Sequence, residues 1–161
     1  MFKRHFIFAF TAAITLLAGC ATGPRPVSIA DTLASQPQLS TLNGLVAKAG
    51  LTDTLKGTGP FTVFAPTNQA FAKVPAAALQ ALANDPAKLK AVLTYHVLPA
   101  KVMAADVKNG NSKTVNGANL ALSKAGNFVT VEDALVQTPD ISATNGIVHI
   151  VDSVLMPPAG R

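Results

Sequence analysis

The chain has 161 residues, of which 49% are hydrophobic and 13% are charged, a composition that excludes disorder and allows one domain with a sizeable core. Its formal net charge is +5, and two of its basic residues are Lys3 and Arg4 at the start of the chain. The remainder has no run of Lys or Arg, so we expect no nucleic-acid partner, because nucleic-acid binding requires clustered basic residues.

Residues 1–19 have the parts of a secretory signal peptide. The basic pair Lys3-Arg4 precedes an apolar run from Phe6 to Leu17, which is shorter than the roughly 18–20 residues that span a bilayer. The run ends in Leu17-Ala18-Gly19-Cys20, which resembles the bacterial lipobox. That resemblance implies that the leader is removed and that Cys20 carries acyl chains, such as palmitate, as the new N-terminus. An ordinary signal peptide with an incidental cysteine is the alternative.

Cys20 is the only cysteine, so the chain cannot form an internal disulfide bond. Acylation at this residue would anchor the protein stably in a membrane, since each buried CH₂ group contributes about 0.8 kcal/mol. Ala21 resembles the pattern of lipoproteins sent to the outer membrane, because an Asp at that position usually signals retention at the inner membrane. We therefore expect a lipoprotein of the bacterial cell envelope, on the outer membrane and facing either the periplasm or the exterior. Residues 20–27 are expected to form a short extended tether.

The first part of the domain is predicted to be helical. Ser28 can cap a short helix over residues 28–35. A second helix is predicted over residues 40–49, where apolar residues recur at helical spacing, and Gly50 ends it. Residues 51–55 can add one more turn.

The stretch from Phe61 to Phe71 predicts a strand, a corner and the start of a helix. Both faces of residues 61–65 are largely apolar, which indicates a central strand of a sheet. Pro66 cannot extend the ladder of backbone hydrogen bonds. The hydroxyl of Thr67 suits the N-cap of the helix that follows.

Two further helices and a strand are predicted next. An Ala-rich helix covers residues 75–83, and another begins with Asp85 as N-cap and Pro86 as the first helical residue. This second helix leads through Tyr95-His96 into a short strand that Pro99 ends.

After a predicted helical turn over residues 102–107, the chain consists of strands separated by turns. Asn-Gly and Gly-Asn pairs mark several turns, and Pro139-Asp140 is expected to be another, exposed turn. The last strand is apolar on both faces and should also be central. The predicted strands cover residues 113–115, 118–122, 128–131, 135–137, 141–144 and 147–152. Helices in the first half and strands in the second indicate the α+β class.

Three segments, in their order and spacing, resemble the fasciclin (FAS1) domain family. Thr62–Phe71 resembles the family's first box, Leu93–Pro99 its Tyr-His segment, and Asp140–Pro157 its second box. The resemblance covers residues 28–157 and leaves residues 158–161 as a tail. It implies a compact β-sandwich or wedge of about seven strands with several packed helices, in which the two boxes lie close together.

Residue patterns that could support catalysis or bind a metal are sparse. No Gly-x-Ser-x-Gly motif occurs, and the two histidines of the domain, His96 and His149, lack the spacing of metal ligands. Glu132 and Asp133 are expected to be a solvated pair at a turn rather than the carboxylates of a glycosidase. The family that the chain resembles is not known for a common enzymatic activity. We therefore expect no enzyme, no metal and no cofactor.

In animal members of that family, a Tyr-His segment and an Asp-Ile pair have been proposed as integrin-recognition motifs. The matching residues here are Tyr95, His96, Asp140 and Ile141, which are therefore candidate interaction residues. A structural role is the alternative, because apolar residues flank Tyr95-His96 and a core histidine can be satisfied by neighbouring backbone groups. His149 alternates with aliphatic residues, which also favours a structural role.

Two functions remain open. The first is an adhesion or interaction module, anchored in the membrane through Cys20, whose surface loops contact a protein, a glycan or a matrix component. The second is binding of a hydrophobic small molecule or lipid in an apolar crevice between helices and sheet. The apolar composition allows the second function but equally describes an ordinary core.

Overall fold

The computed structural model describes residues 27–157. The predicted signal peptide (residues 1–19), the lipobox with Cys20, the tether up to residue 26 and the tail (residues 158–161) lie outside the described residues.

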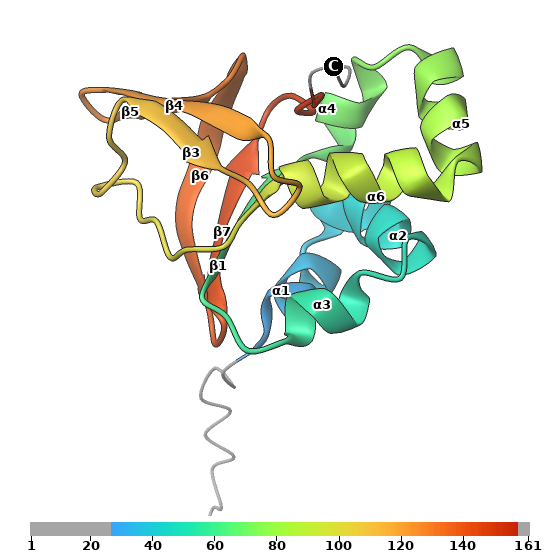
Figure 1. The fold of residues 1–161 in the computed structure, drawn as a ribbon, viewed down its shortest axis with the longest axis horizontal. Coiled ribbons are helices and arrows are strands. Elements are labelled where there is room, and N and C mark those ends of the chain that lie inside the picture. Colours follow the sequence, from blue (N-terminus) through green and yellow to red (C-terminus); the bar gives the residue numbers. More distant parts are fainter. Residues whose placement is uncertain (1–26, 158–161) are drawn as a thin grey trace, which may run out of the picture.

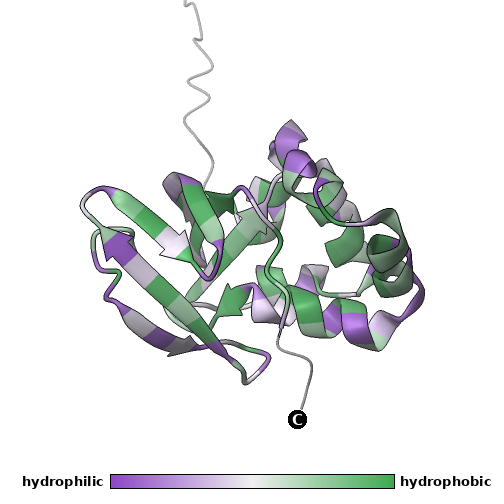
Figure 2. Cartoon of the chain, turned by 90° about the horizontal axis from the view of Figure 1, so that it is seen from above, coloured by the Kyte–Doolittle hydropathy of each residue, from purple (hydrophilic) through white to green (hydrophobic). Residues whose placement is uncertain are grey.

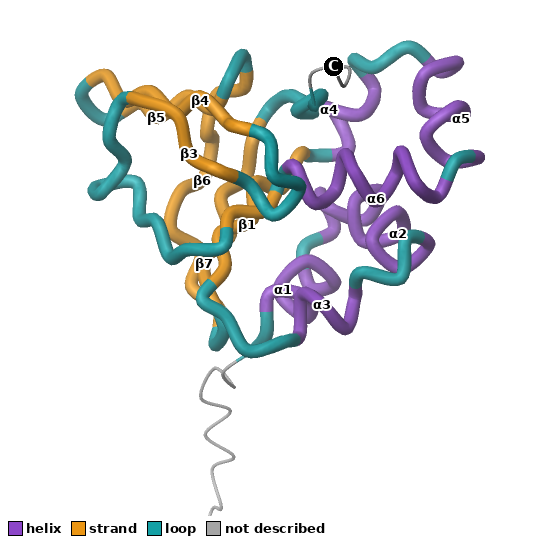
Figure 3. Tube along the Cα trace, in the orientation of Figure 1, coloured by secondary structure: helices purple, strands orange, loops and turns teal. Residues whose placement is uncertain are grey.

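Helices and strands occupy different sides of the domain. Figure 1 shows the strands on the left and the helices on the right, and the tube in Figure 3 shows the same division by colour. The helices are α1 (Ile29–Ser35), α2 (Ser40–Lys48), α3 (Thr52–Lys56), α4 (Asn68–Ala72), α5 (Ala76–Asn84) and α6 (Pro86–Tyr95), with one 3₁₀ turn, η1 (Pro37–Leu39).

The predicted capping residues begin three of these helices. The Ser28 hydroxyl accepts a hydrogen bond from the Asp31 amide, while the Asp31 carboxylate accepts one from the Ser28 amide, which forms a capping box at α1. Thr67 caps α4 by accepting from the Ala70 amide (3.2 Å). Asp85 caps α6. These three predictions are confirmed. They could be made from the sequence because a capping side chain bonds to the backbone of residues only two or three positions further along the chain.

Seven strands form the sheet, as predicted. They are β1 (Phe61–Pro66), β2 (Val97–Leu98), β3 (Gly110–Lys113), β4 (Asn119–Ala125), β5 (Phe128–Val131), β6 (Ala134–Ala143) and β7 (Gly146–Val151). Their order is β2-β1-β7-β6-β5-β4-β3. Strands β1 and β7 are both central and run parallel to each other along their whole length. The first and second boxes are therefore neighbours in the sheet, which confirms the expected arrangement.

The sheet curls until its two edge strands approach each other. Just after β3, the Val115 amide donates to the Val97 carbonyl in β2 (2.8 Å), and the Asn116 amide donates to the Thr94 carbonyl (3.3 Å). These bonds join the two ends of the strand order, so the sheet is nearly closed.

The region predicted as two strands around an exposed turn is one bulged strand. Strand β6 pairs with β7, and the register shifts between Val136 and Thr138 and again between Thr138 and Ile141. Pro139 and Asp140 therefore lie in a bulge inside the strand. The turn prediction is wrong because residues that favour turns also suit bulges, where the ladder of hydrogen bonds is interrupted.

One smaller prediction also differs from the structure. Strand β3 covers Gly110–Lys113 instead of residues 113–115, because Val115 has turned toward β2. The predicted helical turn over residues 102–107 is a single turn, in which the Asp106 amide (2.9 Å) and the Val107 amide (3.1 Å) both donate to the Met103 carbonyl.

Strands β1 and β7 separate two hydrophobic cores. Val63 and Ala65 of β1 pack into the core on the helical side, whereas Phe64 packs into the core enclosed by the curled sheet. Side chains alternate between the faces of a strand, so one apolar strand can serve both cores. Figure 2 shows hydrophobic residues in the strand half and in the helical half of the domain.

Candidate interaction site

Tyr95 and His96 lie where α6 leads into β2, and both side chains are buried. Only 1% of Tyr95 and 2% of His96 is exposed. The Tyr95 hydroxyl lies 3.0 Å from both the Asn119 carbonyl oxygen and Glu132 Oε1, to which it donates. Burial, together with the hydrogen bond and charge of Glu132, raises the pKa of Tyr95 to about 12.

Both ring nitrogens of His96 make hydrogen bonds. The Leu155 amide donates to Nε2 (3.0 Å), so Nδ1 has the hydrogen and donates to the Val92 carbonyl (2.8 Å). Burial lowers the pKa of His96 to about 4, although the bond to Val92 acts in the opposite direction. The ring is therefore neutral at pH 7 and ties α6 to the segment after β7.

Asp140 and Ile141 lie in the bulge of β6 and are half-buried. Asp140 has a φ of 59°, in the left-handed region. Its carboxylate accepts a hydrogen bond from the Ala104 amide (2.8 Å), which ties the bulge to the segment between β2 and β3. Ile141 packs at the border of the helix-side core. Asp140 and Ile141 thus present part of their surface to solvent, which Tyr95 and His96 do not.

The two candidate pairs are connected through the core. The Asp140 amide donates to His149 Nδ1 (3.2 Å), and His149 Nε2 donates to the Val102 carbonyl (2.8 Å). The ring of His149 stacks on Phe64 with centroids 5.6 Å apart. The Phe64 amide in turn donates to the His96 carbonyl (2.9 Å). Burial lowers the pKa of His149, against the opposing effects of the Val102 carbonyl and the Asp140 carboxylate.

Glu132 and Asp133 are exposed at the turn between β5 and β6, as predicted, but Glu132 also makes hydrogen bonds that were not predicted. Its Oε1 accepts hydrogen bonds from the Tyr95 hydroxyl and from the Ala121 amide, each at 3.0 Å. The carboxylate thus satisfies the polar end of a buried tyrosine from a distant part of the chain. Adjacent acidic residues at a turn give no local signal of such a bond.

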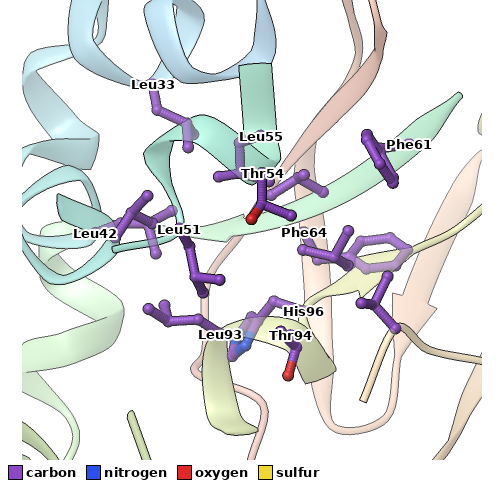
Figure 4. Close-up of a pocket in the computed structure, with 14 residues that line it drawn as sticks. Leu33, Leu42, Leu51, Thr54, Leu55, Phe61, Phe64, Leu93, Thr94 and His96 are labelled. Carbon is purple, nitrogen blue, oxygen red and sulfur yellow. The ribbon is translucent and has the colours of Figure 1, made fainter. Parts of the chain in front are cut away.

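An apolar crevice opens between the helices and β1. It is narrow, with a cavity volume of about 30 Å³, and its lining is almost wholly apolar. Figure 4 shows Leu42, Leu51, Leu93, Phe64 and His96 around it. Both nitrogens of His96 are already bonded, so the crevice offers an incoming molecule chiefly aliphatic and aromatic surface.

Asn145 joins three segments of the chain through its side chain. The sequence predicted only that this residue lies in a turn. Its Oδ1 accepts from the Ile29 amide (2.9 Å), and its Nδ2 donates to the carbonyls of Leu55 (2.6 Å) and Gly57 (2.8 Å). One side chain thus joins the start of α1, the end of α3 and the turn between β6 and β7. The Asn-Gly pair was the only signal, and it carries no information about partners so distant in sequence.

Residues 27–157 contain neither a metal-binding cluster nor a membrane-spanning helix. No cluster of three His, Cys, Asp or Glu side chains in this range is placed to hold a metal ion. No helix in the same range is both long and apolar enough to cross a bilayer.

The sequence pattern of the fasciclin domain matches residues 37–157 of the chain. Protein sll1483 of Synechocystis sp. is 40% identical over 134 residues, which cover 82% of this chain and 74% of that protein. Cell surface glycolipoprotein MPB83 of Mycobacterium bovis is 36% identical over 166 residues, which cover 92% of this chain and 74% of that protein.

The fold is similar to that of a FAS1 domain pair from the insect cell adhesion molecule fasciclin I. The TM-score is 0.68 and the sequence identity is 19%, so this likeness concerns the fold alone. The match covers 81% of this chain and 51% of the insect chain, so this chain spans about half of that domain pair.

Proposed function

Because the chain belongs to the fasciclin domain family, we propose that it is an adhesion or interaction module held at the bacterial cell envelope. The observation that carries this proposal is the similarity, over 92% of the chain, to a protein described as a cell surface glycolipoprotein. The partner would be a protein, a glycan or a matrix component, and binding would rest on surface complementarity without chemical turnover.

The anchor in this proposal is a lipid on Cys20. Its support is the lipobox-like sequence at the end of the predicted leader and the absence of any other cysteine from the chain. Ala21 favours the outer membrane as the destination. Anchoring many copies on one surface raises their local concentration and permits multivalent contact, so that weak individual contacts suffice for adhesion.

The contact surface in this proposal is the bulge of β6 with the adjoining segment between β2 and β3. Asp140 and Ile141 are half-exposed there, and Met103, in the neighbouring segment, is 40% exposed. The hydrogen bond from the Ala104 amide to Asp140 holds the two segments together. Such a surface offers a partner one carboxylate beside apolar side chains. Tyr95 and His96 would support this surface from the core, because their own atoms are covered.

The anchor and the contact surface can be tested separately. Mass spectrometry of protein purified from membranes should find acyl chains on Cys20, and a Cys20→Ala strain should lose envelope retention and surface attachment. Two results together would remove the support for adhesion. In the Cys20→Ala strain, surface attachment and aggregation would be unaltered, and adding purified protein to cells would also leave them unaltered.

For the contact surface, Asp140→Asn is the informative variant. This substitution removes the charge but keeps a hydrogen-bond acceptor at the same position. Asparagine, like aspartate, also tolerates a positive φ. Cells with Asp140→Asn should attach less strongly than wild type, with the same amount of folded protein at the envelope. The matched control is Asp133→Asn, an equal charge change at an exposed position of the neighbouring hairpin, and it should attach normally. Equal attachment by both variants would place the contact elsewhere.

A second candidate function is binding of a hydrophobic small molecule or lipid, which the apolar crevice favours. An aliphatic chain entering between α2, α3 and β1 would have to part the walls of this narrow crevice, and it would then contact Leu42, Leu51 and Leu55. Native mass spectrometry of protein purified from cells would detect such a ligand as added mass. Leu51→Gln should abolish the added mass while Leu135→Gln, outside the crevice, should keep it. A wild-type protein of unmodified mass under mild conditions would count against this function.

A further inference from the structure

A second groove lies at the end of the domain where the described chain begins, and it differs in character from the apolar crevice. Its volume is about 370 Å³. Most of its lining residues come from two segments, residues 57–60 and residues 143–146. The charged side chains that line it are Lys56 and Lys101, and no acidic side chain lines it.

The backbone on both sides of Lys56 is fixed by one side chain. Asn145 Nδ2 donates to the carbonyl of Leu55 (2.6 Å) and to that of Gly57 (2.8 Å), the residues immediately before and after the lysine. Lys56 is exposed, so its ammonium group extends into water from a backbone that is held in place.

Lys101 is fixed in the same manner by a different side chain. The Thr62 hydroxyl donates to the Ala100 carbonyl (2.6 Å) and accepts from the Val102 amide (2.9 Å), again on the two sides of the lysine. Thr62 is fully buried in β1. Two exposed lysines are thus positioned at one groove by a buried threonine of β1 and by a half-buried asparagine in the turn between β6 and β7.

The wall between the lysines is closely packed backbone. A Cβ atom at Gly59 would lie 1.9 Å from the Asn145 carbonyl oxygen, and one at Gly146 would lie 1.9 Å from the Phe61 carbonyl oxygen. The Phe61 amide donates to the same Asn145 carbonyl (3.0 Å). Only glycine permits this approach, so the two segments that line the groove are held against each other through their backbones.

The N-terminal segment enters the domain directly beside this groove. The Thr144 amide donates to the Val27 carbonyl (2.9 Å), and Asn145 Oδ1 accepts from the Ile29 amide (2.9 Å). In Figure 1 the described chain begins at the base of the molecule, next to the loop between α3 and β1. Val27 is seven positions after Cys20, and an extended chain of that length reaches about 25 Å at most.

We propose that the groove between Lys56 and Lys101 docks the domain on the anchoring membrane by binding the phosphate headgroups of anionic lipids. This inference rests on the proposed lipid anchor, because a short tether keeps this end of the domain near the bilayer. The two ammonium groups match phosphate in charge, and the groove that they flank, about 370 Å³ in volume, leaves room for a headgroup. Asp31 lies near enough to Lys56 to be affected by its charge, but its carboxylate is committed to the capping box with Ser28. Docking would fix which face of the domain points away from the membrane.

Lysine acetylation of the full chain, purified as the cells process it and reconstituted in nanodiscs, tests the proposal without any substitution. One set of nanodiscs contains phosphatidylcholine alone, and the other also contains phosphatidylglycerol. Acetylation of Lys56 and of Lys101 should slow about fivefold in the anionic nanodiscs, the factor that corresponds to about 1 kcal/mol for each basic residue at an anionic surface. Lys90 and Lys113, both exposed and outside the groove, are internal controls and should react equally in both.

High salt and a substitution complete the test. Added salt should remove the protection, because ions screen exposed charges. Hydrogen exchange of residues 57–60 and 143–146 should slow on anionic nanodiscs in wild type and in Lys90→Gln/Lys113→Gln, but not in Lys56→Gln/Lys101→Gln. Equal acetylation of Lys56 and Lys101 in both kinds of nanodisc would overturn the proposal.

The mass of the same sample separates this inference from the anchor. An unacylated Cys20 would refute the anchor, and the groove would then be tested by adding vesicles of the two compositions to the unanchored protein. An acylated Cys20 with no difference between the lipids would refute the groove alone.

Discussion

At the scale of single residues, two buried histidines and one bulge aspartate hold together segments that are distant in sequence. His96 bridges Val92 and Leu155, and His149 bridges Val102 and Asp140. Each ring donates from one nitrogen and accepts at the other, a pattern that only the neutral ring can make. Protonation would place a hydrogen on the accepting nitrogen, against a backbone amide.

The first prediction is therefore a loss of stability in mild acid. His96 has an ordinary pKa near 6.5 in the unfolded chain and about 4 in the folded domain, so the unfolded state binds more protons between these values. Its contribution to stability is complete above pH 6.5 and declines as the pH falls toward 4. The free energy of unfolding, measured with urea, should be about 2 kcal/mol lower at pH 5 than at pH 7. Equal values at the two pH values would show that His96 is not buried in its neutral form.

Asp140 gives the second prediction. Asparagine at this position keeps the acceptor for the Ala104 amide and tolerates the φ of 59°, whereas alanine does neither. Asp140→Asn should change the free energy of unfolding by less than about 0.5 kcal/mol, and Asp140→Ala should lower it by about 1–2 kcal/mol. Urea unfolding of both variants at pH 7 checks this. Similar losses in the two would mean that the charge, and not the geometry, stabilises the bulge.

At the scale of elements, β1 supports both cores because each of its faces is apolar. Phe64 is the large side chain that it contributes to the core within the curled sheet, where 1% of it is exposed and it stacks on His149. The same strand pairs with β2 on one side and β7 on the other.

The third prediction concerns this strand. Phe64→Ala should lower the free energy of unfolding by about 3–5 kcal/mol, because it leaves a cavity between β1 and the sheet interior. Phe128→Ala is the matched control, since 67% of Phe128 is exposed, and it should cost less than about 0.5 kcal/mol. Thermal unfolding followed by circular dichroism distinguishes them. A folded Phe64→Ala protein of nearly normal stability that had lost partner binding would instead make Phe64 a binding residue.

The elements that the sequence predicts well are those set by neighbouring residues. Ser28, Thr67 and Asp85 cap helices through bonds to the next turn, and the apolar runs of β1 and β7 identify central strands without knowledge of their partners. The bulge at Pro139-Asp140 was predicted as a turn. The bulge arises from the pairing of β6 with β7, and the residues next to Pro139-Asp140 in the sequence give no information about that pairing. The bonds of Glu132 and Asn145 were not predicted for the same reason.

At the scale of the whole molecule, Asn145 joins the helical side to the sheet. Its three side-chain bonds reach the start of α1 and both sides of Lys56 at the end of α3. The candidate membrane-facing groove and the attachment of the N-terminal segment therefore depend on the same residue.

The fourth prediction follows from this arrangement. Asn145→Ala would leave one amide and two carbonyl groups without their partner and should lower the free energy of unfolding by about 3 kcal/mol. Hydrogen exchange should increase most in residues 27–31 and 55–60. Asn43→Ala, a replacement on the half-buried surface of α2, is the control and should change stability by less than about 0.5 kcal/mol. Uniform exchange across the domain in Asn145→Ala would argue against a local tie.

Tyr95 gives the protein an optical property that its buried position determines. The chain has one tyrosine and no tryptophan, so any tyrosinate absorbance comes from a single ring at the junction of α6 and β2. Because the pKa of that phenol is raised to about 12, the folded protein should not form tyrosinate in moderately alkaline buffer, where an unfolded chain would begin to do so. When the pH is raised, tyrosinate absorbance therefore reports the fraction of molecules in which Tyr95 has become exposed to solvent. The measurement needs no added label.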